Sequence, residues 1–142
     1  MSKFSAFMKQ NKKQRENVKY KATASLCDEK GVALDWELRP LETRETEAIR
    51  ERCTKQVEVV GKKGQYTQKI NTSKYVAEMI VASVVFPNLN DKELQDSYGV
   101  MSATDLLYAM IDNPNEYSEL GQKVQELSGF TPLDEKVDEA KN

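Results

Sequence analysis

The chain has 142 residues, of which 39% are hydrophobic and 31% are charged, and its net charge is −2 at pH 7. This length suits a single domain with a buried core, and no stretch approaches the ~20 consecutive apolar residues of a membrane-spanning helix. There is no histidine, and the two cysteines, Cys27 and Cys53, are isolated. This composition excludes a disulfide framework and argues against both a four-ligand zinc site and a histidine general base.

The charges are unevenly distributed along the chain. Residues 1–30 carry eight Lys/Arg and three Asp/Glu (net +5), residues 31–86 carry nine and eight (+1), and residues 87–142 carry four and twelve (−8). The two ends either neutralise each other across the fold or form two oppositely charged faces for partners. The overall negative charge argues against a nucleic-acid-binding module, which is normally basic.

A basic arm begins the chain. Phe4, Phe7 and Met8 have the i, i+3, i+4 spacing that predicts a short amphipathic helix over residues 2–9, and the region lacks the long apolar core of a secretory signal. A helix this short is unstable alone in water. The arm therefore packs on its own domain or contacts a neighbouring copy or another partner.

A β-hairpin is predicted over residues 18–38. In VKYKATASL (18–26) and VALDWEL (32–38), apolar residues alternate with polar ones. Gly31 can supply the positive φ that a tight connection requires. We expect Trp36 to be buried in the middle of the apolar face, where it anchors the hairpin to the helices. Lysines on one strand and acids on the other predict cross-strand charge pairs.

A helix and a second extended region follow. Thr43 is the expected N-cap of a helix over residues 43–54, which has only a thin apolar stripe. Val57 and Val59 alternate as in an edge strand. The segment GKKG (61–64) is interpreted as a mobile loop or the turn of a second hairpin, because it lacks the GxxxxGK[ST] pattern of a phosphate-binding loop.

Residues 72–86, TSKYVAEMIVASVVF, predict the most buried element. Asn71 and Thr72 provide a cap, and Pro87 ends the segment, so we expect a central helix that is apolar on nearly all sides. The β-branched residues of 80–86 also fit a strand, but length favours a helix.

Three short helices fit between residues 87 and 130. Their expected N-caps are Asn90, Ser102 and Asn113. Met101 and Leu106 have the spacing of a hydrophobic staple, and Pro114 and Gly129 mark the start and end of the third helix. The arrangement is similar to a helix-turn-helix, but these segments are acidic, which argues against a DNA-reading helix.

Together these segments predict an α+β fold, a helix-dominated single domain with an N-terminal β-hairpin packed on about five short helices. We divide the chain into an amphipathic arm (residues 1–16), a domain (residues 17–130) and an acidic tail (residues 131–142). The composition of the tail predicts disorder.

Three stretches of the domain carry a family resemblance. WELRPL (36–41), CTKQVEVVGKKGQYTQ (53–68) and above all VVFPNLNDKELQDSYGVMSATDLL (84–107) resemble the XkdN-like phage tail assembly chaperones. That family comes from contractile-tailed phages, prophages and defective prophages of Gram-positive bacteria. The resemblance runs from about Asn17 to Phe130.

The resemblance implies a non-enzymatic assembly factor without cofactor or metal, which acts in the host bacterial cytoplasm. Such proteins bind the tape measure protein, keep it soluble, assist tail-tube assembly and are absent from the mature virion. Further implied partners are the tail-tube protein, a frameshift-extended form of the chain and other copies of it. Neither nucleic acid nor membrane is implied.

Methionine and aromatic side chains suit an adaptable contact with such a client, although core packing explains methionines equally well. The candidate partner-binding residues are Phe4, Phe7, Met8, Met101 and Met110. Two rival functions remain: a structural tail or baseplate component of the particle, and a small regulatory DNA-binding protein. The second would need a basic recognition helix, which the sequence does not offer.

Overall fold

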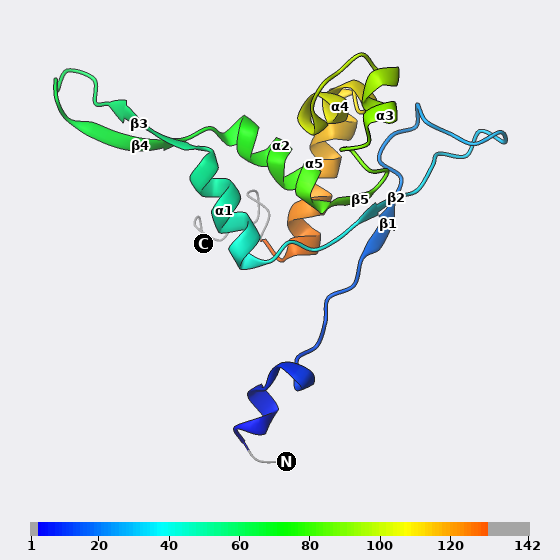
Figure 1. The fold of residues 1–142 in the computed structure, drawn as a ribbon, viewed down its shortest axis with the longest axis horizontal. Helices are drawn as coiled ribbons and strands as arrows, with labels where there is room; N and C mark the ends of the chain where they lie inside the picture. Colours follow the sequence, from blue (N-terminus) through cyan, green and yellow to red (C-terminus); the bar gives the residue numbers. More distant parts are fainter. Residues whose placement is uncertain (1–2, 131–142) are drawn as a thin grey trace, which may run out of the picture.

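The computed structural model describes residues 3–130, and this part of the chain confirms an α+β, helix-dominated domain (Figure 1). The strands are β1 (Val18–Tyr20), β2 (Trp36–Leu38), β3 (Thr54–Glu58), β4 (Tyr66–Ile70) and β5 (Val84–Phe86). The helices are α1 (Thr43–Arg52), α2 (Thr72–Ser83), α3 (Lys92–Ser97), α4 (Ala103–Met110) and α5 (Pro114–Ser128). The predicted tail lies outside the described residues.

The predicted N-terminal hairpin is present and forms part of a three-stranded antiparallel sheet in the order β1-β2-β5. Its two strands pair from Val18↔Leu38 to Tyr20↔Trp36. The expected cross-strand charge pair is also present, since Lys21 Nζ lies 3.1 Å from Asp35 Oδ1.

The strict alternation predicted for residues 18–26 and 32–38 is wrong beyond β1 and β2. Thr23 is buried, whereas Ala24, Val32 and Leu34 are exposed. The reason is a contact with α5. The Thr23 hydroxyl donates to Glu116 Oε1 (2.7 Å) and the Ala24 N–H donates to Glu116 Oε2 (2.8 Å). These bonds turn the strand so that a threonine faces inward.

α2 lies at the centre of the domain, as expected, and packs against α1, α4 and α5. Trp36 is 2% exposed, which confirms the prediction that it is buried. The core cluster contains Ala22, Trp36, Leu38, Leu41, Ile49, Cys53, Met79, Ile80, Val84, Leu89, Leu106, Leu107, Met110, Ile111, Leu120 and Val124. α5 comes close to α2 at Gly121, where a Cβ would lie 3.4 Å from Val76 Cγ1.

The helix predicted over residues 72–86 is three residues too long. It begins at the expected cap, because Asn71 Oδ1 accepts the Lys74 N–H at 3.1 Å, but it ends at Ser83. Residues 84–86 instead form β5 and pair with β2. Ser83 fixes this change, since its hydroxyl donates to Arg39 O (2.7 Å) and its carbonyl accepts from Arg39 N (2.8 Å).

Two of the predicted helix caps are displaced by one residue. α1 is capped by Glu42 rather than Thr43, and the Glu42 N–H donates to Glu45 Oε1 (3.2 Å) as in a capping box. α3 is capped by Asp91 rather than Asn90, with Asp91 Oδ1 accepting the Leu94 N–H at 2.9 Å. In both places a carboxylate of the adjacent residue reaches the free N–H groups of the first turn.

The remaining caps are confirmed. Ser102 Oγ accepts the Asp105 N–H at 3.1 Å, and Asn113 Oδ1 accepts the N–H groups of the first turn of α5. Gly129 ends α5 with φ +95°. The predicted staple between Met101 and Leu106 is wrong, because Met101 is 95% exposed while Leu106 is fully buried.

The arm and the β3–β4 hairpin extend away from this body (Figure 1). The arm does not form the α-helix predicted over residues 2–9 but two 3-10 turns, Ser5–Phe7 and Lys9–Asn11. An isolated short segment gains too few hydrogen bonds to nucleate an α-helix. The second extension is the β3–β4 hairpin. Its turn contains residues 61–64, which confirms the interpretation of GKKG as the turn of a second hairpin. No helix among residues 3–130 meets the length and hydropathy of a membrane span.

Candidate functional site

The described residues hold no cluster of three or more His, Cys, Asp or Glu side chains placed to bind a metal ion. Cys27 is exposed and Cys53 is buried. The Cys53 thiol donates to Glu78 Oε2 at 3.0 Å, and burial, followed by this carboxylate, raises its pKa to about 11. Cys53 therefore stays protonated near neutral pH and serves as a packed donor in the core.

The arm presents the most exposed group of apolar side chains. Phe4 is 78% exposed, Phe7 is 89% exposed and Met8 is 42% exposed. Figure 1 shows the arm that carries them well separated from the α-helices. A partner, rather than the domain described here, must cover these side chains if they are to be removed from water.

The predicted partner-binding methionines are divided between surface and core. Met101, between α3 and α4, is 95% exposed and lies free on the body. Met110 is 6% exposed and belongs to the core cluster, so its side chain packs inside the domain. The structure thus leaves four of the five candidates, Phe4, Phe7, Met8 and Met101, accessible to a partner.

The β3–β4 hairpin is a second accessible surface. Its ten paired residues are exposed or half-exposed, and the turn residue Val60 is 97% exposed. Residues 54–70 carry four lysines and one glutamate. The hairpin is tied to the body at its base, where the Asn71 N–H donates to Cys53 O at 2.7 Å.

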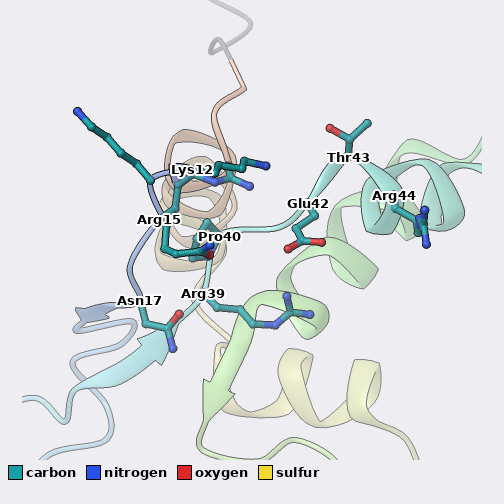
Figure 2. Close-up of a pocket in the computed structure, with 10 residues that line it drawn as sticks. Lys12, Arg15, Asn17, Arg39, Pro40, Glu42, Thr43 and Arg44 are labelled. Atoms are coloured by element: carbon teal, nitrogen blue, oxygen red, sulfur yellow. The ribbon is translucent and has the colours of Figure 1, made fainter. Parts of the chain in front are cut away.

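A basic pocket lies where the arm joins the body, and sequence reasoning did not predict it (Figure 2). We call it the arm-root pocket. Its volume is about 430 Å³. It is lined by Lys12, Lys13, Gln14, Arg15, Asn17, Arg39, Pro40, Glu42, Thr43 and Arg44. Figure 2 shows that these residues come from the connector before β1 and from the segment that leads into α1.

Five cations and one carboxylate line this pocket, and two of the cations have structural partners. Arg39 forms a two-pronged ion pair with Glu45, which keeps the pKa of that carboxyl below its usual range. Arg15 donates to Ser128 O and Leu41 O, both at 2.8 Å. The side chains of Lys12, Lys13 and Arg44 make no hydrogen bond or ion pair with any residue from 3 to 130. The pocket is therefore an anion-attracting surface.

The opposite charge lies on the last three helices. Residues 87–130 carry eight Asp/Glu and two Lys/Arg, and α3, α4 and α5 fall in this range. The uneven charge seen in the sequence thus becomes a basic arm with its pocket, a separate basic hairpin, and acidic helices α3 to α5. These helices offer no basic surface for a nucleic-acid backbone.

The fold is that of a small α+β domain with an exposed basic arm, and comparison with known proteins gives its family. A sequence model described as "Phage XkdN-like tail assembly chaperone protein" matches residues 4–141. The chain therefore belongs to the XkdN-like phage tail assembly chaperone family. This match extends beyond the resemblance expected from Asn17 to Phe130 and includes the arm and the C-terminal segment.

Two relatives support this assignment. The chain is 23% identical over 139 residues to the phage-like element PBSX protein XkdN of Bacillus subtilis (strain 168), covering 97% of this chain and 93% of that protein. It also resembles the crystal structure of the protein YqbN, with a TM-score of 0.74 and 17% identity, covering 92% of this chain and 99% of that one. At that identity the second likeness shows a shared fold.

Proposed function

We propose that this chaperone binds the tape measure protein of its phage or prophage and assists assembly of the tail tube around it. It would act in the cytoplasm of the host bacterium and leave before the particle is complete. The observation that carries the proposal, together with family membership, is the exposed apolar stripe on a basic arm. An assembly chaperone needs reversible contacts of this kind rather than a reactive centre.

The arm supplies the proposed primary contact. Phe4 and Phe7 are the two largest exposed apolar side chains of the arm, and Met8 adds a flexible side chain that adapts to irregular surfaces. A tape measure protein is long and helical, and its apolar stripes need cover until the tube encloses them. Short apolar segments that dock against helices can provide that cover. Met101 is proposed as a separate contact on the body.

The same surfaces suit the other partners that we propose, namely the tail-tube protein, a frameshift-extended form of the chain and further copies of the chain. Weak contacts repeated along one long client add up to strong binding, because each bound copy raises the effective concentration of the next. Phe4 and Met101 are therefore proposed as parts of a repeated, individually weak interaction.

Co-expression with the tape measure protein of the same phage tests this proposal. The double variant Phe4→Ser/Phe7→Ser should lower the amount of soluble tape measure protein recovered with the chaperone several-fold. Val60→Ser is the matched control, because it removes another exposed apolar side chain, in the β3–β4 turn. Equal recovery with all three proteins would contradict a role for the arm.

Purified particles separate the proposal from the main rival function. Mass spectrometry of particles from induced cells should find tape measure and tube proteins but not this chain. Its presence in stoichiometric amounts would make it a structural tail or baseplate component instead.

A further inference from the structure

The root of the arm and the end of α5 lie at the same place on the body. Arg15 joins them, since its Nη1 donates to Ser128 O and its Nη2 donates to Leu41 O, both at 2.8 Å. The Leu41 N–H in turn donates to Ser128 Oγ at 3.0 Å. Phe130, the last residue that the structure describes, therefore lies near the connector that carries Lys12 and Lys13.

A second hollow connects that point with the arm-root pocket. Its lining includes Phe130 and Gly129 from the end of α5 and shares Lys12, Arg15, Glu42 and Thr43 with the arm-root pocket. The two hollows thus form a continuous surface from Phe130 to three cations without partners among residues 3–130. These are Lys12, Lys13 and Arg44.

The sequence that follows has complementary charge. The segment DEKVDE, residues 134–139, contains four carboxylates and one lysine. Its first acid, Asp134, is four residues past Phe130 and its last, Glu139, is nine residues past it. At about 3.3 Å per extended residue these acids can reach roughly 13 to 30 Å from Phe130. Phe130 lines a hollow that shares four residues with the arm-root pocket.

We propose that the arm-root pocket is the docking site of the chain's own acidic segment, residues 134–139. Carboxylates of the segment pair with Lys12, Lys13 and Arg44, while the Arg15 contacts hold the pocket in place. Each exposed ion pair is weak by itself. The short tether compensates, because it keeps the carboxylates at a millimolar effective concentration near the pocket.

The docked segment would cover the charged half of the arm and leave its apolar half free. Phe4, Phe7 and Met8 precede the pocket residues in sequence and none of them lines the pocket. An acidic stretch on another protein would compete with the segment for Lys12 and Lys13. The contact is thus an internal competitor that sets how easily acidic partners reach the arm. This docking depends on the geometry of the pocket and not on which client the chaperone binds.

Zero-length carbodiimide cross-linking of the full chain tests this proposal directly, because the reagent joins a lysine amine to a carboxylate in contact with it. Mass spectrometry should find links from Lys12 or Lys13 to Asp134, Glu135, Asp138 or Glu139. The exposed pair Lys62 and Lys63 in the β3–β4 turn is the internal control and should give few such links. Links distributed equally over both lysine pairs, or no links to the segment, would overturn the proposal.

Isotope mixing decides whether the segment binds its own chain. Equal amounts of ¹⁵N-labelled and unlabelled protein are cross-linked together, and only links within one isotope form are expected. Links that join labelled to unlabelled chains in the statistical proportion would assign the pocket to a second copy, contrary to the proposal.

Limited trypsin digestion provides a second readout in the full chain. A contact of millimolar strength at a millimolar effective concentration fills the pocket half of the time or more, so cleavage after Lys12 and Lys13 should be about two- to ten-fold slower than in a neutralised variant. That variant is Asp134→Asn/Glu135→Gln/Asp138→Asn/Glu139→Gln. Cleavage after Lys62 and Lys63 should be unchanged. High salt should abolish the difference, and equal rates at low salt would refute docking.

Discussion

Trp36 connects the three-stranded sheet to the helices. It is 2% exposed, on a strand paired on both sides. Replacing a buried tryptophan by alanine removes its packing and leaves a cavity, so Trp36→Ala should lower the free energy of unfolding by about 3–5 kcal/mol. Urea unfolding measures this loss. Leu34→Ala is the control just before the strand, because Leu34 is 45% exposed and should lose far less. A loss below about 1 kcal/mol for Trp36→Ala would show that the indole is not packed as described.

The two cysteines should differ in reactivity. Cys53 is buried, and its pKa of about 11 leaves roughly one thousandth of it as thiolate at pH 8. Because the thiolate is the reactive form, the Cys27→Ser variant should react slowly with a disulfide reagent when folded. The rate should rise as the pH approaches 11, and the reaction should be fast in urea, which unfolds the protein. Cys53→Ser retains the exposed Cys27 and should react at once. Equal rates for the two folded variants would contradict burial of Cys53.

At the scale of elements, the β3–β4 hairpin is the part of the body with the least support. An isolated two-stranded hairpin is marginally stable in water, and this one pairs over five positions with no fully buried side chain. Its amide hydrogens should therefore exchange with solvent at least ~100-fold faster than those of α2, which is central. Hydrogen-exchange mass spectrometry compares the two segments in one experiment. Equal protection in dilute protein would mean that the hairpin packs against another surface in solution.

The arm is the second weakly supported element, and its removal should separate stability from binding. Deleting residues 1–11 keeps Arg15, which binds the end of α5, but removes Phe4, Phe7 and Met8. None of these three side chains belongs to the core cluster or to its margin, so the melting temperature should change little. Self-association measured by sedimentation and client recovery should both fall. A large loss of stability with unchanged binding would place the arm in the fold instead.

For the whole molecule, the sequence and the described surface lead us to expect no specific binding of zinc or nucleotide. The chain has no histidine, the GKKG segment is a hairpin turn, and residues 3–130 hold no metal-binding cluster. A ligand that binds only the folded state would raise the melting temperature with concentration. Thermal-shift titrations with Zn²⁺, ATP and GTP should show no such rise. A saturable increase with any of them would refute this expectation.

Much of the fold could be predicted because helix caps and helix ends depend only on residues close to them in the sequence. Asn113 caps α5, Ser102 caps α4 and Gly129 ends α5, since each side chain or φ angle acts within one turn of its own position. The caps of α1 and α3 are Glu42 and Asp91, each one residue from the predicted cap, so such signals locate a helix start only to within about one residue. Neighbouring polar residues compete for the same N–H groups, and only the actual backbone decides which one wins.

Only part of the candidate site could be predicted from the sequence. The spacing of Phe4, Phe7 and Met8 marked them as a contact surface, although they lie on or beside 3-10 turns rather than on the α-helix predicted. Met110 carried the same composition signal as Met101, yet burial separates them completely. Side-chain chemistry names candidates, but exposure depends on which neighbours cover them.

By itself, the sequence determined the α+β class, the order of most elements, the burial of Trp36 and the family. These depend on periodicity, caps and motifs that neighbouring residues define. The tertiary structure alone decided the break at Thr23, the strand at 84–86 and the arm-root pocket. Each depends on partners far apart in the chain: Glu116 lies 93 residues from Thr23, Ser83 lies 44 from Arg39, and Ser128 lies 113 from Arg15. Thr23 and Ser83 are buried, and their hydrogen bonds override local preference because a buried polar group must find a partner wherever the fold provides one.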